Sequence, residues 1–504
     1  METLLLYLPI FLALYVFTNK LFHKIRNLPP SPYPPFPIIG HLYLLKKPLH
    51  RTLSTFNSHG SVLFFQFGFR PVLVVSSPEA TEECLTKNDI IFANRPRLAL
   101  GKYLAYNYTQ LAWAPYGSHW RNLRRISSIE MLSTHRLQML CDVRAEEIRS
   151  LIHGLLSKKD ERVCMRTLFF EITFNLMMRM IAGKRYYGEN VGDLEEARKF
   201  HNTMTESQRV VGPANNIGDF LPFMRWIGLG VKVKELQELQ RKRDEFVQNL
   251  IEEHRKKMVS DCSSLSGGRK TMIDVLLKLQ ETEPEYYKDE IIRGLVLVLL
   301  MAGVDTSVNT MEWAFSLLVN HPQVLKKAQL EINNYVGDNR VMNESDVAQL
   351  PYLHGIISET LRMYPAVPLL IPHESSEEST VKGFRIPRGT MLLVNLWSIQ
   401  NDPKIWENPT SFRPERFEGV EGVRDGFRLM PFGSGRRGCP GEGLAMRMVG
   451  LTLGSLIQCF EWERESEQLV DMKEGSGFTL ARAQPLYLKC RPRADIVELL
   501  SQAH

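Results

Sequence analysis

The chain has 504 residues, of which 44% are hydrophobic and 23% are charged, and its formal net charge is +6. This balance excludes a disordered or collagen-like chain and supplies enough apolar material for a large buried core. The excess of positive charge is modest for this length, so we do not expect nucleic-acid binding, which relies on a concentrated basic stripe.

The cysteine pattern gives no support to a structural zinc site or a disulfide scaffold. There are 7 cysteines, an odd and widely spaced set, and the sequence contains no Cys-x-x-Cys pair. We expect most of them to be small buried apolar residues of a protein in a reducing compartment.

Residues 1–22 are predicted to form a transmembrane signal anchor. Residues 4–17 are almost wholly apolar, and extending the count to residue 22 gives the length of about 20 residues that a bilayer requires. Basic residues follow this run rather than precede it: Lys20, Lys24 and Arg26. This arrangement predicts a single-pass anchor with the catalytic domain in the cytosol, instead of a cleaved signal peptide.

Residues 23–40 are predicted to form a basic, proline-rich hinge. Prolines interrupt this stretch so often that a continuous helix is excluded and extended backbone is favoured. The segment could hold a catalytic domain at a set distance from a membrane, or serve as a plain stiff linker.

The remaining residues, 41–504, are predicted to form one domain that is mostly α with small β-sheets. Runs of Val, Leu and Phe at 62–67 and 72–75 predict strands, and residues 385–395 predict another. Long helical patterns lie between them, and a further helix is expected to begin at Pro440.

The most informative predicted helix spans residues 289–320, a length of about 48 Å at 1.5 Å per residue. Residues 295–301 are apolar on every face, so the middle of the helix is expected to be buried. Two small residues, an acid and a hydroxyl then follow within the buried part: Ala302, Gly303, Asp305 and Thr306. Taken alone, this pattern favours helix packing by the glycine and a hydrogen bond from the threonine to a carbonyl.

Cys439 differs from the other cysteines because glycines, two arginines and a following proline surround it. Glycines let backbone amides approach the sulfur, and the dipole of a helix beginning at Pro440 would favour the thiolate. A thiolate of this kind suits a soft metal centre. The alternative is a structural cysteine in a glycine-rich turn.

The pattern F-x-x-G-x-R-x-C-x-G is matched at Phe432, Gly435, Arg437, Cys439 and Gly441, which has a chance probability of about 10⁻⁴ over this length. It resembles the haem-binding loop of the cytochrome P450 superfamily, the haem-thiolate monooxygenases. The resemblance implies a cytochrome P450 fold, haem b as cofactor, Cys439 as the axial iron ligand, and haem contacts from Phe432, Arg437 and Gly441.

Two further motifs occur in the order that this family has. Glu359 and Arg362 form an E-x-x-R pair, and Pro-Glu-Arg-Phe supplies Arg416, which in the family completes a structural charged triad. Alone, an E-x-x-R pair is common and could be an exposed ion pair worth under about 1 kcal/mol.

The resemblance also assigns residues to the haem propionates. Trp120 and Arg124 match the W-x-x-x-R pattern of a propionate-binding helix. His373 occupies the position of a basic propionate ligand that is often arginine, so its hydrogen bond would depend on its protonation or tautomer.

Within the superfamily, the chain resembles plant microsomal members over essentially its full length. It is similar to the group containing isoflavone 2′-hydroxylases, indole-glucosinolate hydroxylases and lignan methylenedioxy-bridge synthases. The proline segment matches the family pattern except at Ser31, where glycine is usual. The resemblance implies a protein of the endoplasmic reticulum membrane.

The resemblance further implies the reaction. Electrons would come from NADPH through a membrane-bound reductase, and Asp305 and Thr306 would relay protons to the O₂ site. The expected reaction is hydroxylation of an apolar aromatic plant metabolite: a phenylpropanoid, flavonoid, lignan or alkaloid. Two alternatives remain open, oxidative ring closure such as methylenedioxy-bridge formation and a membrane-tethered haem-binding partner protein without turnover. Some bridge-forming relatives replace the threonine by alanine, so Thr306 favours hydroxylation.

By family position, five mainly apolar segments are expected to line the substrate pocket: 98–107, 201–211, 298–303, 366–371 and 477–480.

Overall fold

The computed structural model describes residues 2–157, 161–188, 194–210, 216–225, 233–260, 270–337, 339–420, 422 and 424–494. Its α-helices, in chain order, are α1 (Glu2–Ile25), α2 (Leu49–Ser54), α3 (Pro78–Glu82), α4 (Asp89–Phe92), α5 (Ala99–Tyr103), α6 (Ser118–Ile126), α7 (Thr134–Met139), α8 (Cys141–Leu156), α9 (Met165–Ala182), α10 (Leu194–Val210), α11 (Val233–Ser260), α12 (Met272–Thr282), α13 (Asp289–Asn320), α14 (Pro322–Val336), α15 (Glu344–Val347), α16 (Pro351–Met363), α17 (Leu396–Gln400) and α18 (Glu442–Cys459). The strands are β1 (Val62–Phe67), β2 (Arg70–Val75), β3 (Arg162–Cys164), β4 (His373–Glu374), β5 (Ser379–Val381), β6 (Phe384–Ile386), β7 (Met391–Val394), β8 (Phe460–Arg464) and β9 (Tyr487–Pro492). The chain is therefore mostly helical with small sheets, as predicted.

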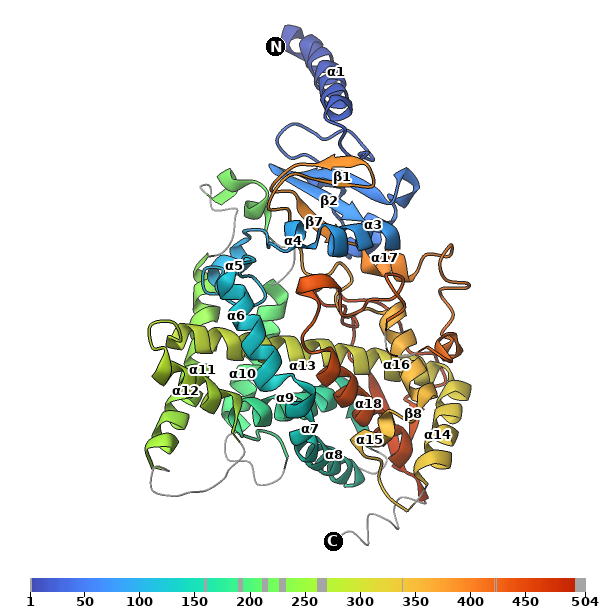
Figure 1. Ribbon diagram of the computed structural model, residues 1–504. Helices are drawn as coiled ribbons and strands as arrows, with labels where there is room; N and C mark the ends of the chain where they lie inside the picture. The colour runs from blue at the N-terminus through green and yellow to red at the C-terminus, as the bar shows by residue number, and fades with distance from the viewer. Residues whose placement is uncertain are drawn as a thin grey trace.

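The strands form three small sheets. The largest has the order β1-β2-β7-β4, in which β2 and β7 are parallel and the other pairs are antiparallel. It lies at the end of the molecule next to α1, away from most of the helices (Figure 1). The other sheets have the orders β3-β9-β8 and β5-β6. The strands expected at 62–67 and 72–75 are present, the second beginning earlier, at Arg70.

The single strand predicted at 385–395 is wrong, because the structure divides this stretch between β6 and β7 in different sheets. Pro387 lacks a backbone N–H, and Gly389 has a φ of +77°, so the chain turns between the two strands.

Helix α13 crosses the helical part of the molecule (Figure 1), and its bounds agree with the predicted helix 289–320. Among the described residues it is the helix that is long and apolar enough to cross a membrane. However, 56% of its apolar 18-residue stretch is buried inside the protein. Its apolar character therefore reflects its central position in the core.

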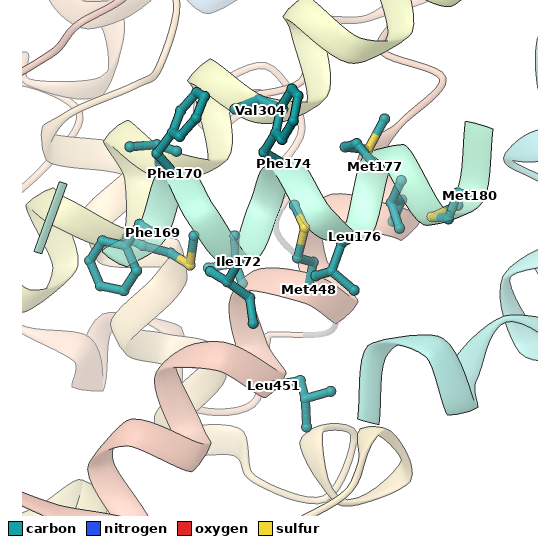
Figure 2. Packing of buried hydrophobic residues seen from close by; sticks show 14 of the residues in the cluster. Phe169, Phe170, Ile172, Phe174, Leu176, Met177, Met180, Val304, Met448 and Leu451 are labelled. Atoms are coloured by element: carbon teal, nitrogen blue, oxygen red, sulfur yellow. The ribbon is translucent and has the colours of Figure 1, made fainter. Parts of the chain in front are cut away.

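Helix α9 packs closely against α13, which also contacts α18 directly. Phe170 and Phe174 point toward Val304 of α13, whereas Leu176 lies on the side of Met448 of α18 (Figure 2). This packing fixes the middle of α13, where the predicted acid and threonine lie, relative to the helix that follows Cys439.

Helix α1 projects away from the rest of the molecule (Figure 1) and continues past residue 22 to Ile25. Large apolar side chains are exposed along it: Phe11, Leu14, Phe17 and Phe22. The proline-rich stretch that follows is attached to the sheets, because the amide of Phe64 donates to the carbonyl of Pro30 at 2.9 Å and that of Arg385 donates to Asn27 at 2.8 Å.

Candidate active site

The loop that carries Cys439 is closed by a hydrogen bond from the Cys439 amide to the Phe432 carbonyl at 2.8 Å. Gly433 and Gly435 both have a φ of +67°, a conformation that other residues rarely adopt. At Gly435 a Cβ atom would lie 2.4 Å from the Leu85 carbonyl oxygen and 2.7 Å from Oδ1 of Asp89. This close approach explains why the loop needs glycine at 435.

The Cys439 sulfur accepts the Gly441 amide at 3.3 Å, and the side chain is exposed. Burial nevertheless raises the pKa of the thiol, outweighing the attraction of Gly441 and of Arg124 for a thiolate. The exposed sulfur thus faces an open space within surroundings that are otherwise dense with protein.

The predicted start of the following helix at Pro440 is wrong, because α18 begins at Glu442 with Gly441 as its N-cap. Pro440 therefore precedes the helix. The amide of the N-cap residue Gly441 still reaches the sulfur, but desolvation of the thiol outweighs it and determines the direction of the pKa shift.

Two arginines fasten this loop to its surroundings, Arg437 within the loop and Arg124 of α6. Arg437 donates to the carbonyls of Ala93 at 2.7 Å and Ala114 at 2.6 Å, and its guanidinium lies 4.5 Å from the centre of the Trp120 ring. Arg124, one turn along α6 from Trp120, donates to the Gly438 carbonyl at 2.7 Å. The W-x-x-x-R pair and the Cys439 loop are therefore in direct contact.

His373 is buried at the start of β4, with its Nδ1 2.7 Å from the Phe92 carbonyl oxygen. A carbonyl only accepts hydrogen bonds, so the imidazole proton sits on Nδ1. Burial, together with the positive charges of Arg95 and Arg437, holds the pKa of His373 well below its usual range.

Arg95 completes this basic cluster, although the sequence analysis did not single it out. It is buried and donates to the carbonyls of Ala112, Ile371 and Pro372. Burial and the nearby Arg437 hold the pKa of Arg95 well below its usual range, and burial together with Arg124 lowers the pKa of Arg437 to about 9. No spacing in the sequence relates Arg95 to its partners, which lie up to 277 residues away.

The basic cluster of Arg95, Arg124, His373 and Arg437 fits an anionic group. The hydrogen bonds described above for these side chains go to carbonyl oxygens, which do not neutralise charge. Asp89 already pairs with Arg436 at 2.6 Å. A prosthetic group bearing two carboxylates would compensate this charge, and an exposed cysteine sulfur is a suitable ligand for its iron, so the residues fit haem.

The E-x-x-R motif forms a buried network on α16. Arg362 and Glu359 pair at 2.7 Å with both side chains 0% exposed, and Arg416 reaches Glu359 at 3.2 Å. The interpretation as an exposed ion pair is wrong, because this helix is packed on both sides.

Asp305 and Thr306 are partly buried on α13, one turn from Ala302, which is exposed in the middle of the helix. The Thr306 hydroxyl donates to the Ala302 carbonyl at 2.7 Å. The Asp305 carboxylate accepts hydrogen bonds from Gln208 of α10 and from Thr479, the latter at 2.6 Å. Neither donor was identified from the sequence, because 97 and 174 residues separate them from Asp305.

These contacts bring three of the predicted pocket segments together beside α13. Gln208 belongs to segment 201–211 and Thr479 to 477–480, and the Leu480 amide donates to Ala366 of segment 366–371 at 2.9 Å. Residue 211 lies outside the described residues.

Comparison with known proteins agrees with this geometry. The model of the family "Cytochrome P450" matches residues 29–490. Cytochrome P450 81Q32 of Catharanthus roseus is 49% identical, covering 99% of both chains. An isoflavone 3'-hydroxylase of Medicago truncatula is 49% identical over 95% of this chain and 96% of its own. A (+)-piperitol/(+)-sesamin synthase of Sesamum radiatum is 47% identical over 94% of this chain and 93% of its own.

The resemblance to this group of plant proteins is thereby confirmed over nearly the whole sequence. The glycine-rich cysteine loop, the basic cluster and the buried triad occur in one chain whose length is matched almost end to end. The chain belongs to the cytochrome P450 family.

Proposed function

We propose that this protein hydroxylates an apolar aromatic plant metabolite, such as a phenylpropanoid, flavonoid, lignan or alkaloid. As a cytochrome P450, it is a monooxygenase that contains haem with a cysteine thiolate ligand and receives electrons from NADPH through a reductase. The bound haem supplies the iron at which O₂ is activated.

In this proposal Cys439 is the axial ligand, and the loop residues Phe432, Arg437 and Gly441 shape its surroundings. The basic cluster supports this assignment, because its four positive or ionisable groups lack a carboxylate partner among the contacts described above. Trp120, Arg124, Arg437 and Arg95 would hold the haem propionates. His373 would donate to a propionate only in its protonated form, because the neutral ring donates from Nδ1 to the Phe92 carbonyl.

The observation that carries the proposed reaction is the arrangement of Ala302, Asp305 and Thr306 on α13. The small exposed Ala302 leaves room beside the helix. Because Thr306 donates its hydroxyl proton to the Ala302 carbonyl, its oxygen keeps lone pairs that can accept a hydrogen bond from the O₂ side. Asp305 is partly buried and directly precedes Thr306, so it is close enough along the helix to supply protons to that region.

The relatives support two related reactions. One is named a hydroxylase of isoflavones and another a synthase of piperitol and sesamin. The retained Thr306 favours hydroxylation for this chain, whereas oxidative ring closure, as in methylenedioxy-bridge formation, is the second candidate.

The reaction is tested by turnover of a panel of plant phenolics, lignans and alkaloids with NADPH and a plant reductase. Hydroxylation predicts products that gain one oxygen atom. Products that instead lose two hydrogen atoms would identify ring closure and overturn the proposal. The Thr306→Ala variant is expected to lower the product formed per NADPH without changing which product forms.

We also propose that residues 1–22 anchor the protein in the endoplasmic reticulum membrane, that 23–40 form the hinge and that 41–504 form the cytosolic catalytic domain. The exposed apolar side chains of α1 support this division, because an isolated helix with such a surface is unfavourable in water. Removal of residues 1–22 is expected to shift the protein from the microsomal to the soluble fraction, and retention in the microsomes would contradict a single anchor.

A further inference from the structure

The carboxylate of Asp305 is held by two side chains from outside α13. Nε2 of Gln208 donates to Oδ1, and the Thr479 hydroxyl donates to Oδ2 at 2.6 Å. The neighbouring Thr306 does not share these contacts, because its hydroxyl donates to the Ala302 carbonyl. The acid and the alcohol are thus hydrogen-bonded to different parts of the protein.

The two donors differ in how they are supported. Thr479 precedes Leu480, whose amide donates to Ala366 at 2.9 Å and whose carbonyl accepts from the indole of Trp313 at 2.7 Å. The turn is therefore fastened to α13 itself. Gln208 lies in the last turn of α10, and its hydrogen bond connects that end of α10 to α13.

The surroundings of Asp305 oppose its ionisation in one respect and favour it in others. Burial raises the pKa of the carboxyl overall. Thr479, Asn309 and Gln208 favour the ionised form, as does Arg166, the charged group that faces it from α9. Arg166 is itself paired with Glu312 at 2.8 Å, so its charge is partly neutralised. The neutral donors therefore have a large share in stabilising the carboxylate.

We propose that Gln208 and Thr479 are positioning residues that hold the Asp305 carboxylate between α10 and the turn at 477–480 and set how readily this acid gives up its proton. Both donors belong to segments predicted to line the substrate pocket. A substrate that displaces either segment would change the hydrogen bonding of the acid, which links occupancy of the pocket to proton supply. This inference rests on the role proposed above for Asp305.

The direct test is an infrared titration of the carboxyl groups in the holoenzyme, in which the Asp305→Asn variant identifies the band of the protonated Asp305. Gln208→Met and Thr479→Val each remove one donor while keeping a similar volume. Each is expected to move the midpoint of the band upward by about one pH unit, because a hydrogen bond to a charged group is lost. Gln208→Leu replaces the methionine variant if that protein does not retain haem.

Two matched variants separate positioning from a general structural effect. Thr479→Ser keeps a hydroxyl and is expected to restore the midpoint of the unmodified enzyme. Gln248→Met removes a similar amide from another aspartate, since Gln248 donates to Asp289 at 2.9 Å, and should leave the midpoint unchanged. The proposal is overturned for either residue if its variant leaves the midpoint where it was, and for both if Gln248→Met shifts it equally.

A second measurement tests whether a changed proton supply from Asp305 alters how the enzyme uses its electrons during turnover. Gln208→Met and Thr479→Val are expected to increase severalfold the share of NADPH electrons released as hydrogen peroxide, with haem content unchanged, whereas Thr479→Ser should not. An unchanged share in both variants would contradict the link to proton supply. The infrared titration needs no turnover, so its result stays interpretable if the proposed substrate class is wrong.

Discussion

Glu359 and Arg362, one turn apart on α16, form a two-point ion pair in which Nε and Nη2 of the arginine lie 2.7 Å and 2.9 Å from the two carboxylate oxygens. Arg362 also donates to the carbonyls of Gln400 and Pro409, each at 2.8 Å. Because the backbone amide of Arg413 donates to the same carboxylate at 3.0 Å, the pair joins α16 to the chain that leads to the Cys439 loop.

Glu359→Gln should destabilise the protein by about 3–5 kcal/mol, because it leaves the buried Arg362 charge without its partner. Arg416→Gln should cost less, since Arg416 makes a longer contact of 3.2 Å and is 11% exposed. Denaturant unfolding followed by circular dichroism measures the unfolding free energy of both variants. Equal losses of stability in the two variants would contradict this account of the triad.

Gly435→Ala should abolish haem incorporation, because the added Cβ would lie 2.4 Å from the Leu85 carbonyl oxygen and the loop could not close. Gly433→Ala is the matched control. Both glycines have a φ of +67°, but the atom nearest to a Cβ at 433 is 4.0 Å away. The control therefore carries only backbone strain of about 1–2 kcal/mol. The ratio of haem to protein in the two purified variants measures haem incorporation. A comparable loss of haem from both variants would show that the close approach at 435 is unimportant.

Glu474 should contribute stability that depends on pH. Its carboxylate contacts Arg51 and His50, the latter at 3.0 Å, and despite the opposing effect of burial these partners lower its pKa from 4.5 to about 2. A lowered pKa means that the unfolded state binds more protons between these values, so the contribution is complete above pH 4.5 and declines as the pH falls toward 2.

The comparison of the unmodified protein with Glu474→Gln measures this contribution, expected to be about 3 kcal/mol at neutral pH. The difference in unfolding free energy between the two proteins should narrow steadily below pH 4.5. A difference that stays constant as the pH falls from 4.5 toward 2 would contradict the assignment.

Much of the architecture could be predicted because it depends on local pattern. The bounds of α13 follow from its apolar residues and its polar ends, and β1 follows from a short run of Val, Leu and Phe. The motif around Cys439 was recognisable because glycines are required at fixed positions of one loop. The start of α18 was misplaced by two residues because proline fits the positions before a helix as well as its first turn.

The residues that the sequence did not reveal act through contacts between distant segments. Arg95 joins the basic cluster through carbonyls of residues 112, 371 and 372, and no local pattern marks an arginine for this use. Gln208 and Thr479 are likewise identified only by their contact with Asp305. Burial of the Glu359–Arg362 pair depends on packing by other elements, which helical spacing cannot indicate.

The central claim, that Cys439 holds the haem iron, is tested most directly by the carbon monoxide difference spectrum of the reduced protein. The unmodified chain is predicted to give the absorption band of a thiolate-ligated haem, and Cys439→Ser is predicted to lose it. Persistence of the thiolate band in Cys439→Ser, or a purified protein that stays colourless after haem supplementation, would contradict the assignment.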